Sequence, residues 1–124
     1  MSTALRNRVA IAGIGETDYS RESGRSEMML ALQAIKAALD DAGIAPSEVD
    51  GLMTWRVDNT SEAEIAANLG VKDLAWFGDI NQAGNVGAAL VAHASAAIVA
   101  GLANVVVIYR GMNGRSGARY GRGE

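Results

Sequence analysis

The feature that most constrains this chain is the run NVVVIY at positions 104–109. A strand without polar alternation is covered on both faces, which is typical of a parallel sheet between layers of helices. The run closes a stretch of 30 residues, 80–109, that contains no Asp, Glu, Lys or Arg. Because this stretch holds Asn, Gln, His and Ser and changes character at Gly101, we interpret it as a buried helix feeding a buried strand and expect no membrane span.

The remaining elements alternate between strand and helix patterns. A helix at 27–42 is predicted by apolar residues at three- and four-residue spacing, with Ser26 as N-cap and Gly43 after its end. Ser61 and Gly70 bound a second helix in the same way. The order predicts an α/β fold, with strands at 8–14, 49–55, 74–80 and 104–109 and helices at 27–42, 62–69 and 85–100.

Composition excludes several classes of site. The 124 residues have no cysteine and a single histidine, His93, so disulfides, a cysteine nucleophile and a multi-histidine metal site are excluded within them. The net charge of −3 gives no support to nucleic-acid binding. No signal peptide is recognisable at the amino terminus, and we expect a cytoplasmic protein that binds neither metal nor nucleic acid.

Two motifs have simple structural interpretations. Gly13-Ile14-Gly15 follows a predicted strand, but position 18 is Asp and the next helix begins about ten residues later, so the pair does not match a dinucleotide fingerprint. We interpret it as a strand-ending turn. The adjacent Asp40 and Asp41 point in different directions on a helix, and we expect them to be solvated.

The corner between the predicted strand 74–80 and the predicted helix 85–100 is the most informative place. An uncharged helix beginning there directs free backbone amides and a positive dipole potential into the interior, where oxyanion sites are built. No Cys, Ser or Thr lies between positions 80 and 94. The alternative is a glycine start that lets helix and strand approach closely. The candidate pocket-lining residues are Asn81, Gln82, Ala83, Gly84 and Asn85.

Positions 110–124, RGMNGRSGARYGRGE, form a Gly/Arg-rich loop with five glycines and four arginines. We expect it to lead from a domain at 1–109 into a remainder of a larger fold, or the chain to pair with another. Such a segment can bind nucleic acid, but Tyr120 is its only aromatic residue and the chain is acidic. A loop that folds over a neighbouring subunit or an anionic ligand is the other interpretation.

Three stretches together resemble the N-terminal region of the thiolase superfamily, in its sterol-carrier-protein and lipid-transfer-protein branch. They are VAIAGIGETDYSRESGRSE, DDAGIAPSEVDGL and GNVGAALVAHASAAIVAGLANVVVIYRGMNGRSGARYG. The resemblance implies the N-terminal part of an αβαβα fold, a mixed sheet flanked by helices, with two similar halves and a dimer. In the family, the strand matching 74–80 pairs with its copy across a two-fold axis, which would bury Trp76.

The thiolase cysteine would fall near Gly84, within 83–85, where this chain has none. The chain therefore looks most like the cysteine-lacking steroid side-chain aldolases, which cleave a β-hydroxyacyl-CoA by retro-aldol chemistry. That resemblance implies an acyl-CoA substrate, no cofactor beyond the CoA of the substrate, and a small OB-fold partner that binds acyl-CoA. It also places a loop near substrate or partner, here Arg115, Ser116, Arg119 and Tyr120, and transfers no catalytic residue to these positions. The alternatives are a thiolase-type acyl-CoA acyltransferase, a non-catalytic homologue, or a small α/β interaction module.

Overall fold

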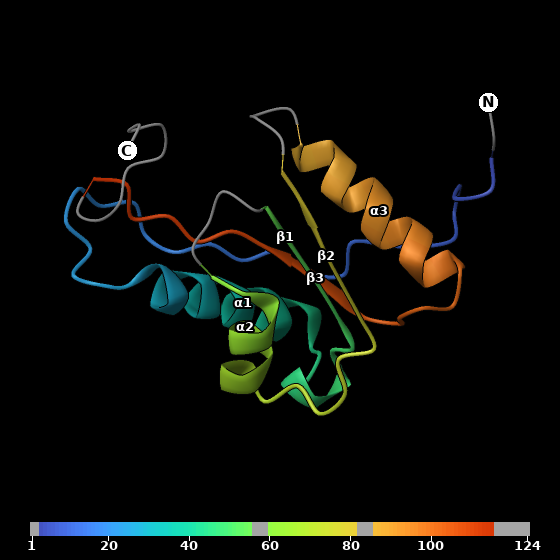
Figure 1. The fold of residues 1–124 in the computed structure, drawn as a ribbon, viewed down its shortest axis with the longest axis horizontal. Helices are drawn as coiled ribbons and strands as arrows, with labels where there is room; N and C mark the ends of the chain where they lie inside the picture. The colour runs from blue at the N-terminus through green and yellow to red at the C-terminus, as the bar shows by residue number, and fades with distance from the viewer. Residues whose placement is uncertain (1–2, 56–59, 82–85, 116–124) are drawn as a thin grey trace.

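The computed structural model describes residues 3–55, 60–81 and 86–115. Within them a three-stranded sheet has helices α1 and α2 on one face and α3 on the other (Figure 1). The α/β fold class is confirmed. The elements are α1 (Glu27–Ala42), the short 3₁₀ helix η1 (Pro46–Glu48), β1 (Gly51–Trp55), α2 (Glu62–Leu69), β2 (Trp76–Ile80), α3 (Gly87–Val99) and β3 (Val106–Tyr109).

The strands lie in the order β2-β1-β3, and both pairings are parallel. Gly51 is in register with Trp76 on one side and with Val106 on the other. All strands described here run the same way, and the mixed sheet that the resemblance implies stays a prediction. Because parallel strands need a crossover, α2 and α3 each connect two strands across a face of the sheet.

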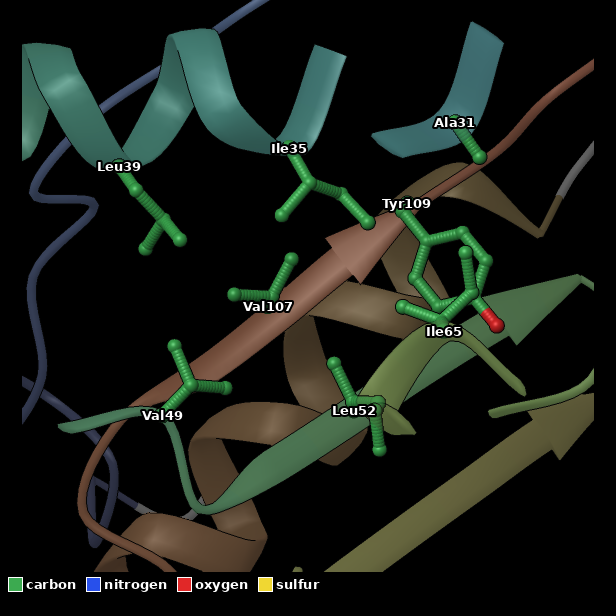
Figure 2. Close-up of a cluster of buried hydrophobic side chains, with 9 residues drawn as sticks. Ala31, Ile35, Leu39, Val49, Leu52, Ile65, Val107 and Tyr109 are labelled. Carbon is green, nitrogen blue, oxygen red and sulfur yellow. The ribbon is translucent and has the colours of Figure 1, made fainter. Parts of the chain in front are cut away.

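The main core lies between the sheet and the α1–α2 layer (Figure 2). Ile35 and Leu39 of α1 point towards Val107 of β3, while Ile65 of α2 lies near Leu52 of β1. A smaller cluster on the opposite face joins Met53 to Leu90 and Ala94 of α3. Successive residues of β1 therefore point into the two different clusters, as expected for a strand covered on both faces.

Both predicted helix caps are confirmed. The Ser26 hydroxyl accepts a hydrogen bond from the Met29 amide at 3.1 Å, and the Ser61 hydroxyl accepts one from the Glu64 amide at 3.2 Å. At the other ends Gly43 and Gly70 adopt left-handed φ angles of 67° and 85°. These local signals place α1 and α2 at the residues that the sequence predicts.

The predicted strand at 8–14 is wrong. This segment has no strand structure, and the side chains of Ile11 and Ile14 are 74% and 76% exposed. It runs against α1, where the Ile14 amide donates to the Asp41 carboxylate at 2.9 Å, so Asp41 is not merely solvated. An apolar pattern alone does not make a β-strand, because a strand also needs a neighbouring strand with which it forms backbone hydrogen bonds.

The glycines of this segment serve close packing and do not end a strand. A Cβ atom at Gly15 would meet the Ala38 amide nitrogen and the Ala34 carbonyl oxygen. One at Gly13 would lie 2.8 Å from the Ala42 Cβ atom. The backbone of 13–15 therefore lies directly on the surface of α1, at a distance that only glycine permits.

The strands begin two residues later than predicted because Asp50 organises their amino ends. Its carboxylate accepts hydrogen bonds from the Asn104 amide at 2.9 Å and the Val105 amide at 2.8 Å. Its carbonyl oxygen accepts from the amides of Ala75 and Trp76 at 2.9 and 3.1 Å. One residue thus joins the starts of all three strands. Burial raises the pKa of Asp50, but the hydrogen bonds from Val105 and Asn104 together outweigh it and lower the pKa below 3.8.

We expect Asp50→Asn to lower the melting temperature at pH 7, because an amide nitrogen cannot accept the hydrogen bonds that one carboxylate oxygen now accepts. Since the folded-state pKa is lowered, the stabilisation by Asp50 is full above the unfolded-state pKa and is lost as the pH falls through the folded value. Thermal unfolding between pH 2 and pH 7 should therefore show a shallower acid dependence in the variant. Asp73→Asn, at an exposed carboxylate, is the control, and equal changes in both variants would contradict the role of Asp50.

We expect Gly15→Ala to lower the free energy of unfolding by about 1–3 kcal/mol, because the added methyl group must displace the α1 backbone. Gly87→Ala is the matched control, since its Cβ atom would meet nothing within 4 Å and α3 begins there. Urea unfolding of the two variants measures the difference. A Gly15→Ala protein as stable as Gly87→Ala would show that the close approach is not maintained in solution.

Candidate functional site

The carboxyl ends of the three strands lie at one edge of the sheet, because all of them are parallel. β1 ends at Trp55, β2 at Ile80 and β3 at Tyr109. In open α/β sheets ligands bind in the crevice outside this edge. The segments that follow the strands are therefore the first place to look for a site.

The corner after β2 is partly described. Asn81 is exposed directly after the strand, and α3 begins at Gly87 behind Val86, whose side chain is 3% exposed. Val86 offers no side-chain acceptor to the first amides of α3. Gln82, Ala83, Gly84 and Asn85 lie outside the described residues. A strand followed by a helix start is confirmed here, while the pocket itself stays a prediction.

Helix α3 is buried along one stripe only. Leu90, Ala94 and Ala97 face the sheet, whereas Val91 and His93 are exposed. Among the described residues, neither core cluster includes a side chain from the outer side of this uncharged helix. The absence of charged residues correctly predicted that the inner side of α3 is buried. It does not show how much of the helix surface is covered by residues of the same chain.

Sequence reasoning missed a cation–π contact at the carboxyl edge. The guanidinium carbon of Arg110 lies 3.7 Å from the centroid of the Trp55 ring. Such a contact attracts the cation to the ring face and holds its planar group in one orientation. It joins the residue that ends β1 to the residue that follows β3. Only the strand order, which puts β3 beside β1, reveals the pair.

The start of the Gly/Arg-rich loop forms one wall of a cleft of about 610 Å³. The opposite wall is the segment 15–20, and Leu30 and Ala34 of α1 contribute apolar surface. Arg110 and Arg115 both line the cleft. Of the loop residues predicted to lie near substrate or partner, only Arg115 is described, because Ser116, Arg119 and Tyr120 lie outside the described residues. The division at 109–110 stays a prediction.

Hydrogen bonds from Arg25 connect the walls of the cleft to α1. Its guanidinium forms an ion pair with Asp18 at 2.6 Å and donates to Gln33 at 2.7 Å, while its carbonyl oxygen accepts from the Asn113 amide group at 3.3 Å. The hydrogen bond and the charge of Arg25 lower the pKa of Asp18. Across residues 3–55, 60–81 and 86–115, no cluster of side chains suits a metal ion, and no helix has the length and apolar content to cross a bilayer.

Two curated proteins are similar to nearly all of this chain. A steroid side-chain-cleaving aldolase from Thermomonospora curvata is 46% identical over 122 residues, which is 98% of this chain. A 17-hydroxy-3-oxo-4-pregnene-20-carboxyl-CoA lyase from Mycobacterium tuberculosis is 46% identical over 118 residues. The chain spans 31% of the length of each and matches their N-terminal part. No model of a known protein family matches it.

Solved structures show the same relationship. An aldolase described as Ltp2-ChsH2(DUF35) superimposes on 88% of this chain with a TM-score of 0.85 and 47% identity, using 28% of its own chain. A monomeric SCP2-thiolase-like protein from Mycobacterium smegmatis covers 79% of this chain with a TM-score of 0.65 and 27% identity, using 22% of its own. The resemblance is confirmed: this chain is similar over nearly all of its length to steroid side-chain aldolases, has structural neighbours that are thiolase-like, and matches the N-terminal part of such proteins.

Proposed function

We propose that the protein is a CoA-linked carbon–carbon lyase that cleaves a β-hydroxyacyl-CoA, with a steroid side chain as the acyl group. The observation that carries this proposal is 46% identity to two proteins named as side-chain-cleaving aldolase and carboxyl-CoA lyase over at least 95% of this chain. The activity is proposed and not shown, because the chain spans less than a third of the length of those relatives.

The proposed reaction is a retro-aldol cleavage. A base takes the proton of the β-hydroxyl group, the bond between the α- and β-carbons breaks, and a ketone leaves. The bonding electrons pass to the thioester as an enolate, which is then protonated at the α-carbon to give a shorter acyl-CoA. Backbone amides at the start of α3 are suited to stabilise the enolate oxygen. The coenzyme A is part of the substrate, and no further cofactor is proposed.

The cysteine count separates this proposal from thiolase-type acyl transfer. Acyl transfer of that kind needs a nucleophile that forms an acyl-enzyme, and this chain has no cysteine at the corner or elsewhere. Retro-aldol cleavage needs a base and an oxyanion site but no nucleophile. We therefore expect no covalent acyl adduct on residues 80–90 after incubation with acetyl-CoA, and intact-mass and peptide analysis would detect one.

We expect Gly84→Val to reduce lyase turnover by about a hundredfold, the usual cost of losing an oxyanion contact, because a side chain fills the space that the substrate carbons need. Gly84→Cys restores the residue of thiolases, and we expect reduced lyase activity with little or no thiolase activity. Ketone release from a β-hydroxyacyl-CoA measures turnover, and circular dichroism confirms folding. Ala96→Val, at an exposed position of α3 away from its start, is the control, and full activity in both Gly84 variants would show that this corner only serves packing.

We also propose a homodimer that pairs β2 with its copy. β2 is an edge strand of the described sheet, and its Phe77, in register with Leu52 of β1, is 64% exposed. Pairing two such edges removes both from solvent. Trp76, which the resemblance implies is buried in the dimer, instead packs on the α3 face against the cluster of Met53 and Leu90. The monomeric relative at 27% identity shows that this fold does not require a dimer.

Phe77→Asp is therefore the sharper test of the dimer. We expect a shift towards monomer in multi-angle light scattering with an unchanged circular dichroism spectrum, because Phe77 contributes little to the internal core. Trp76→Asp should also lower the melting temperature, since it buries a charge in the smaller cluster. Ile11→Asp removes an even more exposed apolar side chain elsewhere and should keep the dimer. A Phe77→Asp protein of unchanged mass would contradict the interface.

We further propose a small OB-fold partner that binds acyl-CoA. The solved aldolase with a TM-score of 0.85 is described by two components, Ltp2 and ChsH2(DUF35), and this description supports an assembly of this kind. The Gly/Arg-rich loop is the segment of this chain proposed to lie near that partner or the substrate.

A further inference from the structure

The connection between β1 and β3 continues past the end of their backbone ladder. Thr54 and Tyr109 are the last pair in register, and the Thr54 hydroxyl also donates to the Tyr109 carbonyl oxygen at 3.2 Å. The two residues that follow, Trp55 and Arg110, are joined through their side chains, since the guanidinium carbon lies 3.7 Å from the centroid of the indole ring. The ring therefore holds the first residue of the Gly/Arg-rich loop against the end of β1.

Arg110 is an engaged residue. It has a further interaction besides the Trp55 ring, so its guanidinium is fixed by more than one contact. A planar cation that is held in this way has little freedom to turn towards a ligand. Arg110 therefore anchors the chain that leaves β3 and is not a group open to a substrate.

The chain crosses the carboxyl edge of the sheet directly after this anchor. Trp55 packs against the smaller cluster on the α3 face. Gly111, the residue after Arg110, is buried against α1 on the other face, where a Cβ atom would lie 2.6 Å from the Glu27 carbonyl oxygen. Two adjacent residues of the loop thus contact elements on opposite faces of the sheet. Its path over the edge is fixed on both sides.

Trp55 also borders the corner after β2. It is in register with Ile80, the last residue of that strand, and both side chains pack against the cluster that contains Leu90 of α3. The chain enters the proposed oxyanion corner directly after Ile80. Trp55 therefore lies beside the strand that leads into the corner and against the residue that starts the loop.

We propose that Trp55 is a positioning residue, whose ring fixes Arg110 and, through it, the path of residues 111–115 relative to the corner after β2. The inference rests on the proposed function, in which this loop lies near the substrate or the partner. A loop held in one placement strengthens substrate binding, because the apparent affinity falls with the fraction of molecules in the competent state. This holds whether the loop contacts the acyl-CoA itself or the partner that binds it.

Limited digestion with trypsin measures release of the loop without turnover. Cleavage after Arg110 requires its side chain to enter the protease, so the rate reports the fraction of molecules in which Arg110 has left the ring. In the protein at its native length and in its native assembly, we expect Trp55→Leu to speed this cleavage about twofold to fivefold, the size of an exposed cation–π contact. Cleavage after Arg8, in the exposed amino-terminal segment, is the internal standard.

Two variants separate the ring face from the bulk of the side chain. Trp76, the only other tryptophan of the chain, packs against the same cluster, so Trp76→Leu should lower the melting temperature as Trp55→Leu does but leave cleavage after Arg110 unchanged. Trp55→Phe keeps an aromatic face and should restore most of the slow cleavage, whereas leucine offers the cation no such face.

Turnover links the loop to the reaction. We expect Trp55→Leu to raise the KM for a β-hydroxyacyl-CoA about twofold to fivefold with kcat nearly unchanged, and Trp55→Phe to stay near the parent protein. A fall in kcat at constant KM overturns the inference, because the effect then acts at the corner and not through the loop. Equally fast cleavage in Trp55→Phe and Trp55→Leu, or in Trp76→Leu and Trp55→Leu, also overturns it. A protein that cleaves no β-hydroxyacyl-CoA rejects the proposed function, while the trypsin series still decides whether Trp55 positions the loop.

Discussion

The carboxylate and backbone of Asp50 hold the amino ends of all three strands, and the geometry of the opposite edge depends on this junction. The Val105 carbonyl oxygen accepts hydrogen bonds from Asp50 and Gly51, while the Asp50 side chain accepts one from the Val105 amide. β3 is thereby fixed in register with β1 before the ladder begins. Because register shifts move every side chain to the other face, this junction decides which residues reach the carboxyl edge. The contact of Trp55 with Arg110 at that edge depends on it.

Helix α1 provides the second fixed frame. Segment 13–15 lies on its carboxyl-terminal half, and the loop after β3 lies on its first turn, in both cases through glycines that leave no room for a Cβ atom. The two walls of the cleft are thus positioned by one helix, although they are about ninety residues apart in the chain. Arg25, just before the helix, adds hydrogen bonds to both walls. Close backbone contact is the physical reason for these glycines, and neither turn geometry nor a dinucleotide site is needed to explain them.

The sequence predicted those parts of the fold that local interactions decide. Ser26 and Gly43 bound α1 because capping uses residues three or four positions away, which a single sequence displays. Segment 8–14 failed for the opposite reason: its pattern fits a strand, but pairing depends on a distant strand that the pattern does not identify. The strand order β2-β1-β3 also depends on pairing between distant segments, so the sequence did not predict it. For the same reason the contact of Trp55 with Arg110 was not predicted. Of the candidate site, the helix start after β2 followed from the sequence, whereas the cleft that Arg115 lines did not.

The corner after β2 explains how one fold can serve two reactions of thioesters. Acyl transfer and retro-aldol cleavage both place negative charge on the thioester oxygen, and both gain from amides and a helix dipole directed at it. Only acyl transfer also needs a nucleophile at the same place. α3 begins behind β2 without any charged residue in its first turn, so its dipole is not offset by a nearby charged side chain. Under the proposed function, a corner without a cysteine has no acyl-enzyme route and keeps the proposed oxyanion site, which is the part that carbon–carbon cleavage requires.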